Sequence, residues 1–200
     1  DAGYVVGSAG VRRGAVIAAV NGTAIAGIAD LEGAVDKLGD GDRTTIRYAT
    51  IDDPNGSQLR SVRMDRRWFP AQRCKRNDGT GYWDCRALAT PPPPKAPVAG
   101  STVFQTVSDP QVARIVPSLV TVTFDMPYAV AGVTERHYYG TGLVVDAARG
   151  LVVVDRNTVP VSLGDVRVTF AGTLEVPGRV VFVHPLHNLA MVQYDPTLIG

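Results

Sequence analysis

Two apolar, β-branched segments joined by a short polar break constrain the fold of this chain most. They are Gly140–Asp146 and Gly150–Val159, and Ala147-Ala-Arg-Gly150 lies between them. Valine has a stiff χ1 and packs well on a pleated surface, so both segments favour strands and together predict a β-hairpin. Because both faces of the run are apolar, we expect its strands to be buried inside a barrel or a sandwich.

Composition and charge exclude several classes of partner. The 200 residues are 45% hydrophobic and carry a net charge of +1, which suits a packed core in one or two domains. So small a net charge favours neither nucleic acid nor a membrane as partner. The basic cluster from Arg60 to Arg76 is interrupted by Asp65, Trp68 and Phe69, which favours a solvated strand face over a nucleic-acid patch. No apolar run reaches the roughly 18 residues of a membrane helix.

Residues 1–70 predict a first unit of mixed α and β structure. A short strand is expected at Tyr4–Val6, and an apolar strand from Gly14 ends in the turn Asn21-Gly22. Asp30 is the expected N-cap of a helix that closes at Gly39. The helical spacing is carried by Leu31, Ala34, Val35 and Leu38. Two further strands are expected at 43–51 and 58–65.

Residues 71–88 predict a cysteine-bearing hairpin around the turn residues 77–81. A turn centred between Gly79 and Thr80 places Cys74 opposite Cys85, Lys75 opposite Asp84 and Arg76 opposite Trp83. Opposed cysteines predict a cross-strand disulfide where the Cα separation allows it, and two thiols are the alternative in a reducing compartment. Two sulfur ligands without a third at zinc spacing argue against a metal, and we expect neither metal nor cofactor.

Residues 89–102 predict a proline-rich linker, and residues 103–200 a second unit. A short capped helix is expected at 108–116, with Pro110 in its first turn. Strands are expected at 119–125, 166–170, 179–183 and 190–194. With the hairpin at 140–159, the second unit has about six strands, which is enough for one small barrel.

The segment Gly140-Thr-Gly-Leu-Val-Val-Asp146 and its partner strand resemble the first hairpin of the HtrA/Deg serine proteases, which have a chymotrypsin-like double barrel. In active members the second strand ends in Thr-Asn-x-His-Val-Val, and here Asn157 stands at the histidine position. The segment Val183–Val192 is similar to the family's Asp-Leu-Ala strand, and Asn188 occupies the aspartate position. No Gly-x-Ser-Gly-Gly-like nucleophile segment is present in the sequence.

The chemistry of a catalytic triad does not tolerate these replacements. The base must accept a proton near neutral pH, which an imidazole does and an amide does not. The carboxylate must orient that base and stabilise its cation, which neutral Asn does poorly. We therefore expect this chain to be inactive as a protease, while the resemblance implies a serine endopeptidase acting in protein quality control in the parent protein.

The segment Gly14-Ala-Val-Ile-Ala-Ala-Val-Asn-Gly22 resembles the Gly-Asp-x-Ile-x-x-Val-Asn-Gly segment of HtrA-type PDZ domains, with Ala15 in place of Asp. The resemblance implies a groove for peptide carboxyl termini between a helix and an edge strand. On that basis the candidate peptide-binding residues are Tyr4, Val5, Val6, Leu31 and Val35. We expect the carboxylate-binding loop, which precedes this segment in the family, to be missing from the unit.

Two further segments, Met64–Cys74 and Tyr82-Trp-Asp-Cys85, resemble the large duplicated HtrA/Deg proteases of the fungal nuclear pro-apoptotic type and their plant relatives. In that group a second, degenerate protease domain follows the PDZ modules. The implied fold is mainly β: a truncated PDZ-like α+β domain followed by the first barrel of a chymotrypsin-like domain. The implied function is non-catalytic regulation or assembly, with homo-oligomerisation through the parent. The alternative is a PDZ-type adaptor that recognises unfolded or C-terminal hydrophobic peptide segments.

Several other residues are candidates for metal, catalytic or peptide-contact sites. A three-histidine metal site from His137, His184 and His187 is disfavoured because Pro185 and the absence of a helix prevent a shared face. We expect surface or capping histidines instead. Asp146 and Asp155 are expected to be acids next to turns. Tyr138 and Tyr139 are expected to pack at the barrel mouth, and a retained peptide-contact surface there is the alternative.

Overall fold

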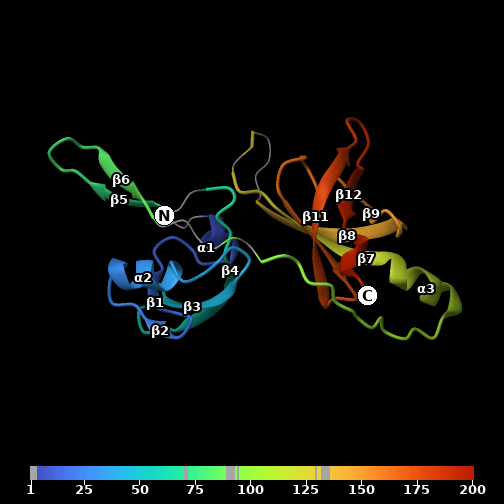
Figure 1. Cartoon of the computed structure of the whole chain (residues 1–200), viewed down its shortest axis with the longest axis horizontal. Helices are drawn as coiled ribbons and strands as arrows, with labels where there is room; N and C mark the ends of the chain where they lie inside the picture. Colours follow the sequence, from blue (N-terminus) through green and yellow to red (C-terminus); the bar gives the residue numbers. More distant parts are fainter. Residues whose placement is uncertain (1–3, 70–71, 89–92, 94, 129, 132–135) are drawn as a thin grey trace. The chain divides into compact units, whose positions relative to one another are not determined.

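The computed structural model describes residues 4–69, 72–88, 93, 95–128, 130–131 and 136–200. The chain forms two compact units, Asp1–Lys95 and Ala96–Gly200. The first contains a four-stranded antiparallel sheet and a separate two-stranded hairpin, and the second contains a closed six-stranded barrel (Figure 1). The protein is therefore mainly β, as the sequence predicts. Among the described residues, none of the helices has the length and apolar character needed to cross a bilayer.

The sheet of the first unit has the strand order β2-β1-β3-β4. Its strands are β1 Val16–Val20, β2 Thr23–Ala24, β3 Arg43–Ala49 and β4 Gln58–Arg63. Asn21 and Gly22 both have positive φ, at 49° and 78°, and form the tight turn between β1 and β2. Alternate residues of β3 are buried, which is the period-2 pattern of a strand with one face on a core. That core consists of Val11, Val20, Ile46, Tyr48 and Val62.

Two local predictions for the first unit are wrong. Tyr4–Ser8 is a short helix, α1, instead of a strand. The β-branched pair Val5-Val6 is compatible with either state, and both side chains pack against the core of the unit from the helix. The helix α2, Ile28–Val35, begins after its N-cap Gly27 and not after Asp30.

Asp30 acts within α2 in a different role from the one predicted. Its carboxylate accepts hydrogen bonds from the backbone N–H groups of Ala26 and Gly27, both at 3.0 Å. A carboxylate in the first turn also favours the helix by its charge. The helix then ends at Val35, and Asp36 is the C-cap, so Gly39 lies beyond it.

The cysteine-bearing hairpin consists of β5, Gln72–Arg76, and β6, Trp83–Ala87. Its register is the predicted one, with Cys74 opposite Cys85 and the two neighbouring pairs in place. Cys74 and Cys85 form a disulfide across the ladder, with Cα atoms 4.0 Å apart. Residue 71 of the predicted hairpin lies outside the described residues, as do residues 89–92 and 94 of the predicted linker.

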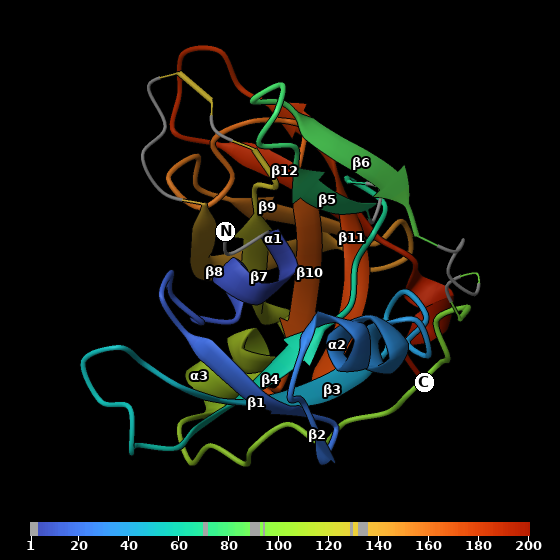
Figure 2. The ribbon, with the colours of Figure 1, turned by 90° about the vertical axis from the view of Figure 1, so that its left-hand side faces the viewer.

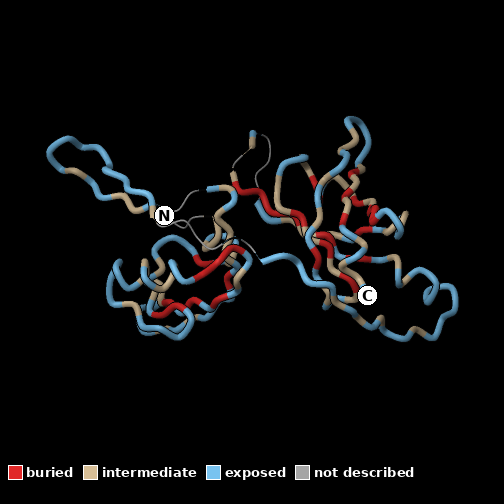
Figure 3. Tube along the Cα trace, in the orientation of Figure 1, coloured by how far each residue is buried: buried red, intermediate tan, exposed pale blue. Residues whose placement is uncertain are grey.

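The barrel of the second unit closes in the order β10-β11-β12-β9-β8-β7. Its strands are β7 Leu119–Asp125, β8 His137–Asp146, β9 Leu151–Val154, β10 Asp165–Phe170, β11 Leu174–Val183 and β12 Ala190–Tyr194. Closure comes from β7, which pairs with β8 on one side and with β10 on the other. The six strands can be followed in Figure 2, and the buried residues follow them in Figure 3.

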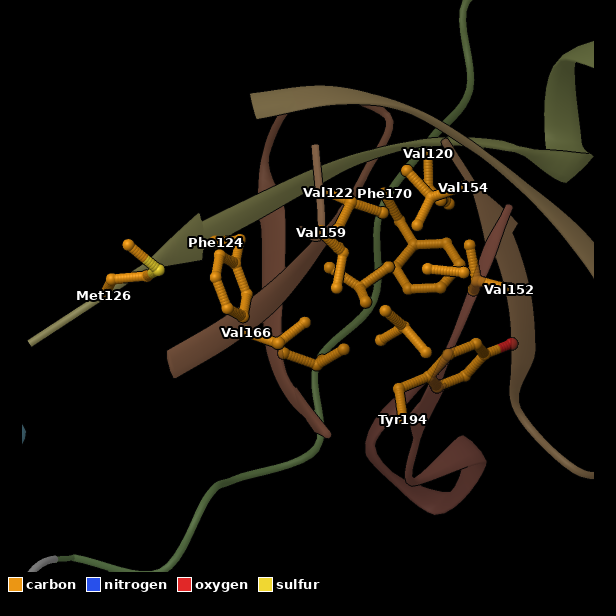
Figure 4. Close-up of a cluster of buried hydrophobic side chains, with 14 residues drawn as sticks. Val120, Val122, Phe124, Met126, Val152, Val154, Val159, Val166, Phe170 and Tyr194 are labelled. Carbon is orange, nitrogen blue, oxygen red and sulfur yellow. The ribbon is translucent and has the colours of Figure 1, made fainter. Parts of the chain in front are cut away.

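Apolar side chains point into the barrel and form one buried cluster, whose 14 residues Figure 4 draws as sticks. Phe124, Val122 and Val168 are fully buried. The Gly-Thr-Gly segment of β8 is needed for this packing. A Cβ on Gly142 would lie 2.6 Å from Val152, and a Cβ on Gly140 would lie 2.1 Å from the hydroxyl of Thr158. These two glycines therefore allow β8 to approach the interior.

A short helix precedes the barrel and two 3₁₀ turns border its strands. The helix α3, Pro110–Ile115, is capped by Asp109, whose carboxylate accepts from the N–H groups of Gln111 and Val112. The 3₁₀ turns are η1, Val116–Ser118, and η2, Pro196–Leu198. Gly100 forms an isolated parallel bridge with Ile199.

The hairpin at 140–159 is confirmed as β8 and β9, but its predicted burial on both faces holds for β9 only. All of β9 is buried or half-buried. On β8, Leu143 and Val145 remain 44% and 51% exposed because they lie on the outside of the barrel. The apolar outer face of β8 is thus solvent-accessible within this unit. The strand β11 also begins at Leu174, five residues earlier than predicted.

Candidate functional site

The two segments that carry Asn157 and Asn188 lie next to each other at one end of the barrel. Asn157 follows β9 and Asn188 precedes β12, and these strands are paired with Val154 opposite Ala190. The side-chain Oδ1 of Asn188 accepts a hydrogen bond from the backbone N–H of Arg156 at 2.8 Å. Strand pairing therefore makes neighbours of the two segments that carry the positions identified by resemblance.

Arg156 holds the loop before β12 in place. Its Nη1 donates to the backbone oxygens of His184 at 2.9 Å and Pro185 at 3.2 Å. Inside the loop, Nδ1 of His184 accepts from the N–H groups of Leu186 and His187 at 3.1 and 3.0 Å. His184 thus caps this loop, and the ring centroid of His187 lies 4.6 Å from its own. Because Nδ1 is an acceptor, the neutral ring carries its proton on Nε2 and offers no lone pair there to a metal.

Asn157 itself is exposed, and its neighbours form a turn. Asp155 accepts from the backbone N–H of Thr158 at 3.0 Å and from its hydroxyl at 2.9 Å. Asp146 similarly accepts from the backbone N–H of Arg149 at 2.9 Å. Both acids act as turn residues, as the sequence predicts. Thr158 is buried and bonded to a carboxylate, so its hydroxyl is not presented as a nucleophile.

A His–Asp pair that the sequence pattern did not reveal lies where β7 ends and β8 begins. Nδ1 of His137 is 2.5 Å from Oδ1 of Asp125, and Arg167 binds the other carboxylate oxygen. The Asp125 side chain is only 7% exposed. Asp165 and Glu175 lie 3.9 and 4.0 Å from Arg167 and complete a charged network on the outer barrel face. The hairpin register, with Asp125 opposite His137, is the signal that would have found it.

The geometry of this network favours a structural role for the pair. A triad carboxylate orients one imidazole, whereas the carboxylate of Asp125 is divided between His137 and a fixed guanidinium. The imidazole of His137 is half exposed and lies 6.3 Å from the ring of Tyr139, measured between centroids. Tyr139 is 75% exposed, whereas Tyr138 packs against Phe124, so only one tyrosine of the pair packs at the barrel.

The five candidate peptide-binding residues of the first unit lie on its two helices: Tyr4, Val5 and Val6 on α1, and Leu31 and Val35 on α2. Val5, Val6 and Leu31 pack against the core of the unit. The backbone oxygen of Val35 accepts from Nη2 of Arg66 at 2.8 Å, and that of Tyr4 accepts from the hydroxyl of Ser8. These residues therefore contribute to the folding of the unit, and their role in peptide binding stays a prediction.

One cavity of about 410 Å³ opens on the first unit between α1 and β1. Its lining is part apolar and part basic, and consists of Val6, Val11, Arg12, Arg13, Gly14, Ala15 and Ile17. Only Val6 belongs to the predicted set. Arg12 and Arg13 were not in the predicted set, because the resemblance placed the carboxylate-binding loop outside the unit.

A second cavity, of about 440 Å³, lies on the barrel between β11 and the end of β12, and Tyr194 and Asp195 are among its lining residues. Burial, and secondarily the charge of Asp146, raises the pKa of the Tyr194 phenol. The hydroxyl and N–H of Thr197 lower the pKa of Asp195. Each shift follows from local structure and assigns no chemistry to this cavity.

The chain is therefore a mainly β protein, and in its barrel the segments that carry Asn157 and Asn188 are hydrogen-bonded to each other. The chain is 42% identical over 161 residues to the pro-apoptotic serine protease nma111 of Neosartorya fischeri. It is 43% identical over 164 residues to nma111 of Aspergillus clavatus and 38% over 169 residues to NMA111 of Pyricularia oryzae. These matches cover 78%, 80% and 82% of the chain. No protein-family model matches the chain.

The chain spans 16% of the length of each of these curated relatives. Identity of about 40% over most of the chain shows that it is homologous to a segment of these HtrA-type serine proteases. The closed antiparallel barrel agrees with the barrel that the resemblance implies.

Proposed function

We propose that this chain is a non-catalytic regulatory or assembly part of an HtrA/Deg-type serine endopeptidase that acts in protein quality control. In this proposal residues 1–70 are a PDZ-like domain, and residues 103–200 are the N-terminal barrel of a degenerate protease domain. The observation that supports it is the hydrogen bond from Arg156 to Asn188, which joins the two segments with vacated triad positions. Homo-oligomerisation through the parent protein is part of the same proposal.

The chemistry of the two amides supports a non-catalytic role. Neither Asn157 nor Asn188 can take a proton from a nucleophile at neutral pH. Asn188 instead uses its oxygen to fix the backbone of the neighbouring loop. A barrel can keep its binding surfaces after losing bond cleavage, because the two depend on different groups.

Catalysis is tested with casein turnover and with a fluorophosphonate probe, using trypsin as the positive control. We expect no turnover and no labelling, for the native chain and for the double variant Asn157→His/Asn188→Asp. The double variant restores a base and a carboxylate, but the sequence has no Gly-x-Ser-Gly-Gly-like segment to supply the nucleophile. Hydrolysis by the purified native chain that the fluorophosphonate blocks would contradict the proposal.

Membership in a longer protease is tested with an antibody raised to residues 100–200. We expect it to detect a native band several-fold above the 21.2 kDa of this chain. A native band near that mass would favour the second candidate function instead.

The second candidate is a PDZ-type adaptor for hydrophobic peptide carboxyl termini. It is favoured by the cavity between α1 and β1, where apolar side chains lie beside Arg12 and Arg13, a combination that suits an apolar side chain with a carboxylate. Labelled peptides with free and amidated carboxyl termini separate the two functions. Saturable binding that is lost on amidation and in Arg12→Ala/Arg13→Ala, but kept in the control Arg179→Ala, would favour the adaptor.

A further inference from the structure

The β5–β6 hairpin of the first unit is largely exposed to solvent. All five residues of β6 are exposed, and on β5 only Arg73 and Cys74 are half-buried. An isolated two-stranded hairpin is at best marginally stable in water, since it buries little apolar surface. The disulfide between Cys74 and Cys85 supplies the covalent link that burial does not. Cys85 is exposed, so this disulfide is open to reagents in solution.

The residue pair next to the disulfide connects the hairpin to the helix α2. Arg73 and Arg86 are opposite each other in the ladder, one position from the cysteine pair. Both reach the same carboxylate oxygen, Oε2 of Glu32, at 3.1 and 3.2 Å. The Glu32 side chain is only 18% exposed, and its second oxygen is buried without a hydrogen-bond partner among the described residues.

The two ion pairs depend on the hairpin geometry. An exposed ion pair contributes little by itself, because solvent screens it and two long side chains must be ordered. Arg73 and Arg86 are 41% and 62% exposed. When the strands are linked, binding of one arginine to Glu32 raises the effective concentration of the other. The contact with α2 is therefore cooperative only while the strands stay paired.

We propose that the Cys74–Cys85 disulfide is a reversible redox latch that holds the hairpin against Glu32 of α2. A dithiol reductant attacks the exposed bond, the S–S bond breaks, and the two sulfurs leave as thiols. The reductant takes up the lost bond as its own disulfide, so two electrons and two protons pass to the protein. The strands then separate, Arg73 and Arg86 no longer act together, and Glu32 becomes accessible to solvent.

Carboxylate footprinting tests this latch on the whole chain. A water-soluble carbodiimide with glycine ethyl ester modifies exposed carboxylates, and mass spectrometry gives the rate at each one. We expect the rate at Glu32 to rise about five- to tenfold after treatment with dithiothreitol, the gain expected from losing two exposed pairs. Re-oxidation should restore the slow rate. Asp36, the exposed C-cap of the same helix, is the internal control and should not change.

Matched variants separate the latch from general loosening of the unit. In Cys74→Ser/Cys85→Ser, Glu32 should be modified at the fast rate of the reduced native chain, with or without reductant. In Arg73→Ala/Arg86→Ala, Glu32 should be modified at the fast rate even with the disulfide intact. Arg76 contacts Asp78 at the tip of the hairpin, and in the control Arg76→Ala the rate at Glu32 should equal that of the native chain. Equal Glu32 rates in the oxidised and reduced native chain would overturn the proposal. Two free thiols in the denatured, air-oxidised protein would also overturn it.

Discussion

The barrel and the β5–β6 hairpin are both antiparallel β structure, yet they are stabilised by different means. In the barrel each strand pairs on both sides, and alternate side chains fill one apolar interior. The hairpin has two free edges and almost no buried residue. A disulfide and two ion pairs to Glu32 take the place of a core.

The difference shows which substitutions each region tolerates. A closed interior is close-packed, so changes of side-chain volume are costly wherever they occur in it. A cross-linked surface hairpin tolerates volume changes but depends on a few polar and covalent contacts. The first unit lies between these cases. Its sheet has a small apolar core, and Arg66, whose side chain is 9% exposed, hydrogen-bonds the backbone oxygens of Val35 and Leu38 at the end of α2.

Removal of a large, fully buried side chain from the barrel core should have the largest effect. Phe124 is completely buried, and Phe124→Ala should lower the free energy of unfolding of the barrel by about 4 kcal/mol, through lost burial and a new cavity. Hydrogen exchange read separately for each unit would measure it. The hairpin amides should keep their native exchange rates, and equal loss of protection there would contradict the separation of the two regions.

Gly150 tests how tightly the barrel turn is packed. It has φ of +67°, and a Cβ would lie 2.1 Å from the backbone oxygen of Tyr194. Gly150→Ala should therefore cost about 3 kcal/mol, since backbone must shift in addition to the left-handed strain. Gly172 has φ of +71° but open space around it, so Gly172→Ala should cost only about 1 kcal/mol. Equal costs in urea unfolding would show that packing does not matter at this turn.

Arg66 tests whether the first unit depends on polar contacts. Its guanidinium donates to the backbone oxygens of Leu38 and Val35 at 2.6 and 2.8 Å, and its backbone N–H donates to Asp40. Arg66→Ala keeps the backbone hydrogen bond to Asp40 but removes the donors to the backbone oxygens of Leu38 and Val35, and it should lower the free energy of unfolding of the first unit by about 2 kcal/mol. Arg47→Ala is the matched control with no expected loss. Tryptophan fluorescence during urea unfolding reports on this unit, because Trp68 and Trp83 both belong to it.

Tyr194 should give the smallest effect, and only at high pH. Burial raises the pKa of its phenol above the ordinary value of 10.0. The Tyr194 phenol therefore keeps its proton to higher pH in the folded state than in the unfolded chain. Its contribution to the free energy of unfolding is complete below pH 10 and is lost as the pH rises through the folded pKa. In Tyr194→Phe the stability of the barrel should fall less steeply above pH 10. An unchanged slope in urea unfolding at pH 9 and pH 11 would contradict the assignment.

Much of the fold could be predicted because it is local in the sequence. The bounds of β7 and β12 follow from alternating apolar residues, and the register of β5 and β6 follows from their turn. The failures are also local. Tyr4–Val6 is too short for its β-branched residues to decide between strand and helix, and Asp30 satisfies a helix N-terminus from inside the helix.

The candidate sites were predicted less completely. The sequence identifies Asn157 and Asn188 by resemblance, and their roles remain predictions. It does not reveal that Asn188 binds the backbone of Arg156, because that contact joins residues 32 positions apart. The pairing of His137 with Asp125 and the docking of Arg73 and Arg86 on Glu32 were missed for the same reason.

The sequence by itself determined the mainly β character, the six barrel strands and the cysteine register. These depend on side-chain alternation and turn residues, which act over a few positions. Only the tertiary structure decided the closure of β7 on β10, the exposure of the outer face of β8, and the contacts of Asn188, Asp125 and Glu32. Such contacts are set by which strands become neighbours in space, and a linear pattern does not encode the distance between residues that are far apart along the chain.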